Sequence, residues 1–181
     1  MAKIGFIGMG NMGTAILEGL LKERSPEDML FTAAHQEKME AVTARTGVPH
    51  AASNSQCAAE SEYLILAVKP QYFDQVFAEI RESLRPGQIV ISLAPGLTIA
   101  GLRERLGGNV RVVRAMPNTP ALLGEGMTGA AWEEGALQPG EEEEIRAIFT
   151  ACGRMVRVEE RLMDAVGCVS GCSPAFVYMF I

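Results

Sequence analysis

A glycine-rich turn lies at the start of the chain, between a short apolar segment and a segment with helical apolar periodicity. Residues 4–13 read Ile-Gly-Phe-Ile-Gly-Met-Gly-Asn-Met-Gly, and residues 14–21 continue as Thr-Ala-Ile-Leu-Glu-Gly-Leu-Leu. This order predicts a strand, a G-x-G-x-x-G turn and a helix. In such a turn Gly8 permits the tight bend, Gly10 lets a pyrophosphate approach the backbone, and Gly13 lets the helix pack on the strand. The helix N-terminus adds free N–H groups and the positive end of its dipole. We therefore expect a dinucleotide here; the alternative is a glycine-rich turn without a ligand.

Strand and helix patterns then alternate along the chain. The expected strands are Lys3–Ile7, Met29–Ala33, Tyr63–Val68, Gln88–Leu93 and Val110–Ala115, with a further short strand near Val48. The expected helices are Gly13–Glu23, Glu37–Arg45, a short one capped by Ser53 or Asn54 and ending near Ser61, Tyr72–Leu84, and one from Thr98 to Leu106. Uninterrupted apolar strands are typical of strands buried on both faces. The pattern predicts an α/β fold with a Rossmann-type, doubly wound, mostly parallel sheet covered by helices on both sides.

The last third of the chain has a different pattern. Gly126–Trp132 and Arg154–Val158 are expected strands around a helix at Glu141–Cys152, and the sequence becomes helical from Arg161, with a break at Ser170–Pro174. Residues 175–181 resemble the opening of an apolar helix without a polar face, which must be buried against something. We therefore expect a dinucleotide-binding domain in residues 1–163 and, in residues 164–181, the beginning of an all-helical domain of a longer protein. The alternative is a C-terminal helix packed into its own core.

Composition narrows the classes of partner and compartment. The net charge is −6 and the chain has no basic cluster, so nothing favours nucleic acid or an anionic membrane as a partner. The N-terminus lacks a signal-peptide pattern and no apolar run in the sequence is long enough for a membrane span, which predicts a soluble cytoplasmic protein. The cysteines, Cys57, Cys152, Cys168 and Cys172, form no C-x-x-C pair and the chain has two histidines. We expect buried free thiols and no metal site.

The end of the second expected strand bears on the choice between NAD and NADP. In NAD-selective folds an acidic residue at this position binds the ribose 2′-hydroxyl. Residues 31–36 read Phe-Thr-Ala-Ala-His-Gln and contain no acid. The absence of a carboxylate permits a 2′-phosphate and favours NADP over NAD, with His35 as the candidate recognition residue. The alternative for His35 is a solvated loop residue.

Three further loops follow expected strands at the edge where open α/β sheets bind ligands. They are Ala67-Val68-Lys69-Pro70, Ser92-Leu93-Ala94-Pro95-Gly96 and Arg114-Ala115-Met116-Pro117-Asn118-Thr119-Pro120. Small residues in the second loop let a nicotinamide lie against the backbone, and Asn118 and Thr119 suit a carboxamide. The alternatives are a solvated Lys69 and a rigid turn in which Asn118 and Thr119 bond to their own backbone.

Together these motifs resemble the pyrroline-5-carboxylate reductase family over essentially the whole chain. The most specific are the Met116–Ala121 loop and Val169–Phe176, which reads Val-Ser-Gly-Cys-Ser-Pro-Ala-Phe. The resemblance implies cofactor contacts along the turn, at the 2′ region, at a ribose and along the strand-end loops. The residues implied are Ile7, Gly8, Met9, Gly10, Asn11, Met12, His35, Asn54, Ala67, Val68, Lys69, Pro70, Leu93, Ala94, Pro95, Met116 and Asn118.

The resemblance also implies an activity. It is hydride transfer from NADPH, with NADH as the alternative donor, to the C=N carbon of 1-pyrroline-5-carboxylate, giving L-proline in the last step of proline biosynthesis. A protonated imine is already electrophilic, so the protein mainly positions the reactants. The family's dimerising helical domain carries a Gly-Gly-Thr-Thr-like substrate segment that these residues do not contain. We therefore assign no catalytic residue, and expect a dimer-based homo-oligomer and negligible reductase activity from residues 1–181 alone.

Two small departures and two alternatives remain. Pro95 stands where the family commonly has Ala, which removes a backbone donor near the cofactor, and Cys172-Ser173 replaces the more usual Ser-Gly or Ser-Ser. One alternative is a non-catalytic dinucleotide-binding module. The other is a β-hydroxyacid or prephenate-type dehydrogenase, which would need a catalytic Lys or His in its own context. His50 lies in the wrong region for that role and Lys69 precedes Pro70 as in the reductases.

Overall fold

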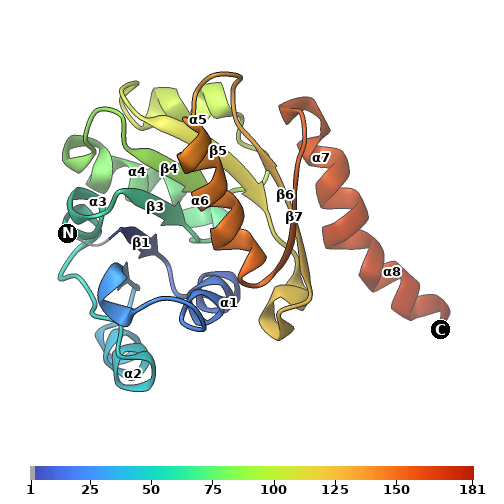
Figure 1. Ribbon diagram of the computed structural model, residues 1–181, viewed down its shortest axis with the longest axis horizontal. Coiled ribbons are helices and arrows are strands. Elements are labelled where there is room, and N and C mark those ends of the chain that lie inside the picture. Colours follow the sequence, from blue (N-terminus) through green and yellow to red (C-terminus); the bar gives the residue numbers. More distant parts are fainter. Residues whose placement is uncertain (1–2) are drawn as a thin grey trace.

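A single twisted sheet organises the part of the chain that the computed structural model describes, residues 3–181 (Figure 1). Its strand order is β2-β1-β3-β4-β5-β6-β7. The strands are β1 Ile4–Ile7, β2 Met29–Thr32, β3 Tyr63–Leu66, β4 Ile89–Ser92, β5 Arg111–Met116, β6 Gly126–Ala131 and β7 Gly153–Arg157. Strands β5 and β6 are antiparallel, whereas the other neighbouring pairs are parallel. The expected Rossmann-type, mostly parallel sheet is therefore confirmed.

Helices cover both faces of the sheet. They are α1 Asn11–Leu20, α2 Gln36–Thr46, α3 Asn54–Glu60, α4 Phe73–Ile80, α5 Ile99–Arg105, α6 Pro139–Thr150, α7 Met163–Val166 and α8 Ser173–Phe180. One apolar layer packs α1, α2 and α6 on the sheet, and a second packs α3, α4 and α5 on the opposite face. Figure 1 shows α1 and α6 lying together over one face. Because both faces are covered, strands β1 to β4 are buried at every position.

Local capping signals explain where several helices begin and end. The Ser53 hydroxyl accepts from the Gln56 N–H and caps α3, and the Thr98 hydroxyl accepts from the Gly101 N–H and caps α5. Gly47 ends α2 in the left-handed region, at φ +75°. The strand expected near Val48 was wrong: the chain makes only an isolated bridge between Phe31 and His50 there.

The chain changes direction across the sheet after β2. From β1 it runs to β2 on one side, and then crosses through α2 and α3 to β3 on the other side of β1. After the neighbouring strands β1 and β3 the chain runs to helices on opposite faces of the sheet, α1 and α4, which makes this edge a topological switch point, where open α/β sheets bind ligands. The glycine turn Gly8–Gly13 begins at this point.

We expected the C-terminal helix to break at Ser170–Pro174, but it does not. Helix α7 continues through a π-helical segment, Gly167–Cys172, directly into α8. In an α-helix the ring of Pro174 would clash with the carbonyl of Ser170, four residues earlier. The wider π turn accommodates the proline without ending the helix.

Helix α8 projects away from the sheet at the end of the chain (Figure 1). Its apolar side chains are exposed, and Phe180 is 89% exposed. Across the described residues, one helical run, Glu160–Phe180, is long and apolar enough to cross a membrane, although we expected no such run. One helix that meets a criterion of length and composition is only a weak indication of a membrane span.

The four cysteines fall into two classes. Cys57 and Cys152 are buried as expected, whereas Cys168 and Cys172 are exposed, so the expectation of buried thiols was wrong for this second pair. Their segment was expected to pack into a helical domain, but the π segment lies on the surface of the described chain. Burial raises the pKa of the Cys57 thiol to about 12 and also raises the pKa of Cys152.

We expect two of the four thiols to react rapidly with dithionitrobenzoate at pH 8, because only the exposed pair can form accessible thiolates. All four should react after unfolding in guanidinium chloride. The double substitution Cys168→Ser and Cys172→Ser should abolish the rapid reaction and leave only the slow reaction of the two buried thiols. Rapid reaction of all four thiols in the folded chain would contradict the burial of Cys57 and Cys152.

Candidate cofactor-binding site

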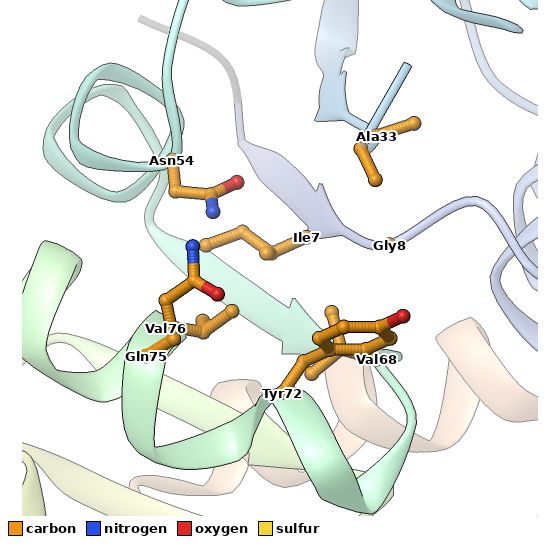
Figure 2. A pocket seen from close by; sticks show the side chains of 9 residues that line it. Ile7, Gly8, Ala33, Asn54, Val68, Tyr72, Gln75 and Val76 are labelled. Carbon is orange, nitrogen blue, oxygen red and sulfur yellow. The ribbon is translucent and has the colours of Figure 1, made fainter.

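A pocket of about 340 Å³ opens at the carboxyl edge of the sheet, at the switch point (Figure 2). Ile7 and Gly8 contribute to it from the end of β1, Ala33 and Ala34 from the end of β2, and Val68 from the end of β3. Three successive strand ends thus enclose one space, as the sequence patterns predict.

Backbone geometry explains two of the three glycines in the turn. Gly8 has a φ of +101°, and a Cβ there would lie 2.8 Å from the carbonyl of Ala67. A Cβ on Gly13 would lie 2.3 Å from the carbonyl oxygen of Gly8, because α1 packs directly on the turn. The roles expected for Gly8 in the bend and for Gly13 in close packing are confirmed.

Gly10 is different, because a Cβ on this residue would meet no atom of the described chain within 4 Å. Its φ of −75° is one that any residue adopts. Packing within the described residues therefore does not require glycine here, whereas a ligand that touches the backbone would require it.

The N-terminus of α1 begins beside this open space. Gly10 occupies the N-cap position, and within residues 3–181 no side chain caps the helix and no acid lies in its first turn. The first N–H groups of an α-helix lack intrahelical partners and carry partial positive charge. Asn11 and Met12 therefore present backbone donors that fit a pyrophosphate, without a competing carboxylate.

Two of the residues that line the pocket, Asn54 and Gln75, belong to a chain of hydrogen-bonded polar side chains. The Thr32 hydroxyl donates to Oδ1 of Asn54 (2.5 Å), and Nδ2 of Asn54 donates to Oε2 of Glu79 (2.7 Å). Nε2 of Gln75 donates to the other oxygen of Glu79 (2.8 Å). Figure 2 shows the amide groups of Asn54 and Gln75 facing one another across the pocket. Glu79 fixes both amides, and each NH₂ group keeps a second hydrogen that suits a ribose hydroxyl.

Sequence reasoning missed several residues that line this pocket. Ala33 and Ala34 were passed over as the end of a strand, and Gln75 and Val76 as part of an amphipathic helix. Tyr72 is 51% exposed, and its ring lies beside Val68 at the pocket (Figure 2). The available signal was position: Tyr72 follows the strand-end loop Ala67–Pro70 by two residues.

The remaining predicted residues lie along the same edge of the sheet but outside this pocket. Lys69 and Pro95 are exposed, and His35 is exposed just after Ala34, at the N-cap of α2. Met9 and Ala94 are buried. The Ala94 N–H is already engaged by the Ser92 hydroxyl (3.2 Å).

The side chain of Asn118 forms hydrogen bonds with other residues of the chain. Its Oδ1 accepts from the Met127 N–H (2.8 Å), and its Nδ2 donates to the Ser170 carbonyl (3.1 Å). The amide therefore joins the loop after β5 to β6 and to the π segment.

Arg114 forms a second link to the C-terminal helix. It is 4% exposed, and its guanidinium donates to Oε1 of Glu160 (3.1 Å). The same carboxylate oxygen accepts from the Ile99 N–H at the start of α5 (2.6 Å). Glu160 therefore joins β5 and α5 to the segment that leads into α7, a role that the sequence pattern does not show.

The comparisons with known proteins agree with this geometry. Residues 3–96, just over half of the chain, match the family model described as NADP oxidoreductase, coenzyme F420-dependent. The chain is 37% identical to a pyrroline-5-carboxylate reductase of Escherichia coli K12, over 99% of this chain and 67% of that protein.

Two solved structures are similar over nearly all of the chain. A pyrroline-5-carboxylate reductase from Coxiella burnetii has a TM-score of 0.92 and 31% identity, over 99% of this chain and 67% of that chain. A pyrroline carboxylate reductase from Plasmodium falciparum, solved with NADP bound, has a TM-score of 0.85 and 30% identity, over 99% and 66%. The chain thus spans about two thirds of the length of these relatives.

Proposed function

Because this chain belongs to the pyrroline-5-carboxylate reductase family, we propose that its switch-point pocket and glycine turn hold NADP for the reduction of 1-pyrroline-5-carboxylate to L-proline. The family consists of NAD(P)H-dependent oxidoreductases that act on a small molecule. NADPH supplies the hydride when it is bound.

The open space at Gly10 is the observation that carries this proposal. A glycine that nothing in the described chain requires stands at the uncapped N-terminus of α1. A pyrophosphate explains both features, since it needs close backbone approach and it accepts from the free N–H groups.

The residues of the chain bind and orient the cofactor. Residues 7–12 hold the pyrophosphate through backbone groups. Asn54 offers an amide hydrogen to the ribose of the adenosine. His35 lies at the 2′ region. The loops Ala67–Pro70 and Leu93–Pro95, together with Met116, line the path toward the nicotinamide. Orientation of this kind supplies much of the rate when the substrate is already electrophilic.

We also propose that residues 164–181 belong to a second, helical unit with which the protein self-associates. Within the described chain α8 contains no buried residue, and its exposed side chains include Phe176, Tyr178 and Phe180. Contiguous apolar surface of this kind marks an interaction site. The substrate-binding groups lie in this second unit, and residues 1–163 hold the cofactor.

A cytoplasmic location fits the proposed reaction and composition. The net charge of −6 favours neither nucleic acid nor an anionic membrane surface as a partner. We propose a soluble homo-oligomer that acts on a cyclic imino acid.

The reaction is tested by product analysis. The gene product is incubated with NADPH and 1-pyrroline-5-carboxylate, and the formation of L-proline is followed by mass spectrometry together with the loss of absorbance at the NADPH band. We expect one proline per NADPH oxidised, and negligible turnover by residues 1–181 alone. Binding of NADPH without proline formation by the gene product would leave a binding module instead of a reductase.

Replacing His35 by aspartate is expected to reverse the preference between the two cofactors. A carboxylate at the end of β2 accepts from the ribose 2′-hydroxyl of NAD and repels the 2′-phosphate of NADP. The ratio of dissociation constants for NADPH and NADH should shift toward NADH by about tenfold or more, which corresponds to roughly 1.4 kcal/mol. His35→Asn is the matched control, because it removes the imidazole without adding charge. An equal effect of both variants would place the 2′-phosphate elsewhere.

A further inference from the structure

The two most specific motifs of the sequence touch each other in the structure. Their contacting residues lie 52 positions apart in the sequence, one in the loop after β5 and the other in the π segment between α7 and α8. The side chain of Asn118 makes the contact, through Nδ2 to the carbonyl of Ser170 (3.1 Å).

The carbonyl of Ser170 has no donor in the α-helical register. In an α-helix the carbonyl of residue i accepts from the N–H of residue i+4. The residue four positions after Ser170 is Pro174, which has no N–H. The amide of Asn118 supplies a donor that the helix itself lacks in that register.

Asn118 is in turn held firmly in its loop. Its Oδ1 accepts from the Met127 N–H of β6 (2.8 Å), and its carbonyl accepts from the Ala121 N–H (3.0 Å). These two hydrogen bonds fix the position of Asn118 in its loop. Its contact with the Ser170 carbonyl therefore forms a bridge that joins that loop to the π segment. The methyl group of Met116 lies near the same segment, since a Cβ added to Gly167 would meet it at 3.8 Å.

We propose that Asn118 is a positioning residue. Its side chain holds the π segment Gly167–Cys172 against the loop Met116–Pro120, and so sets where α8 stands relative to the nicotinamide end of the cofactor site. This role replaces the direct cofactor contact expected from the sequence, and its catalytic consequence rests on the proposed function.

The variant Asn118→Asp separates the two contacts of the side chain. Aspartate keeps an oxygen that accepts from the Met127 N–H, but it places a second oxygen, without a hydrogen, against the Ser170 carbonyl. In the gene product we expect kcat/KM for 1-pyrroline-5-carboxylate to fall by about tenfold or more, as for loss of a partly buried hydrogen bond. The dissociation constant for NADPH should stay within about twofold. A parallel loss of NADPH affinity would overturn the proposal, because it would mean that the side chain holds the cofactor directly.

Hydrogen–deuterium exchange tests the same bridge without any activity. In the 181-residue chain, Asn118→Asp should speed the exchange of amides in residues 167–176 and leave those of α1 unchanged. Unchanged exchange in residues 167–176 would overturn the inference even if the reductase assay succeeds. Absence of proline formation by the unaltered gene product, with faster exchange in the variant, would instead remove the proposed function and leave the bridge.

Discussion

Substituting alanine for Gly10 is expected to weaken NADPH binding by roughly tenfold to hundredfold while the fold stays intact. The added methyl group points into space that is empty of protein, so it meets only the cofactor. Overpacking a close contact costs about 1–3 kcal/mol, which gives this range of affinity. The measurement is a fluorescence titration of NADPH into the variant, accompanied by thermal unfolding. Alanine caps a helix less well than glycine, so a stability loss of up to about 1 kcal/mol is expected.

Gly13→Ala is the matched contrast within the same turn. Here the added Cβ would lie 2.3 Å from the carbonyl oxygen of Gly8, so the backbone of the turn must move. We expect Gly13→Ala to lose both affinity and a larger part of its stability, whereas Gly10→Ala loses affinity and at most about 1 kcal/mol of stability. Unchanged NADPH binding by Gly10→Ala would show that no ligand occupies the space beside Gly10.

Glu160→Gln is expected to lower the free energy of unfolding by about 1.5–3 kcal/mol, the range for a hydrogen bond to a charged group. The glutamine oxygen can still accept from the Ile99 N–H, but the buried guanidinium of Arg114 loses the nearer of its two carboxylate partners and keeps only Asp164, 3.9 Å away. A chain of this size should then unfold at a temperature roughly 3–12 °C lower. Calorimetry or circular dichroism measures the shift.

The neighbouring carboxylate supplies the control for this prediction. Glu159 pairs with Arg161 on the surface, where both side chains are more than half exposed. Exposed pairs contribute little, so Glu159→Gln should leave the unfolding temperature unchanged within error. Equal shifts of the unfolding temperature for the two variants would show that the Arg114–Glu160 contact stabilises the fold no more than the exposed Glu159–Arg161 pair.

The cofactor end of the site could be predicted because its signals are local. The glycine turn, the apolar strands and the caps at Ser53 and Thr98 each depend on a few adjacent residues. The side-chain partners could not be predicted, because they join residues far apart in the chain. Glu79 meets Asn54 across 25 residues, and Glu160 meets Arg114 across 46.

The C-terminal segment shows the same limit in a different way. Pro174 correctly signalled an irregularity, but local rules equate a proline with a helix break. The structure instead uses a π turn and a side chain from a distant loop. The exposure of Cys168 and Cys172 follows from that arrangement, and composition alone suggested the opposite.

The most direct test of the account is a calorimetric titration of NADPH and NADH into the 181-residue chain. We predict saturable binding of one NADPH per chain, with weaker binding of NADH, because no carboxylate stands at the end of β2 to accept from a ribose 2′-hydroxyl. Circular dichroism of the same sample establishes that the chain is folded. A folded chain that binds neither cofactor would contradict the assignment of the glycine turn and its pocket as the NADP site.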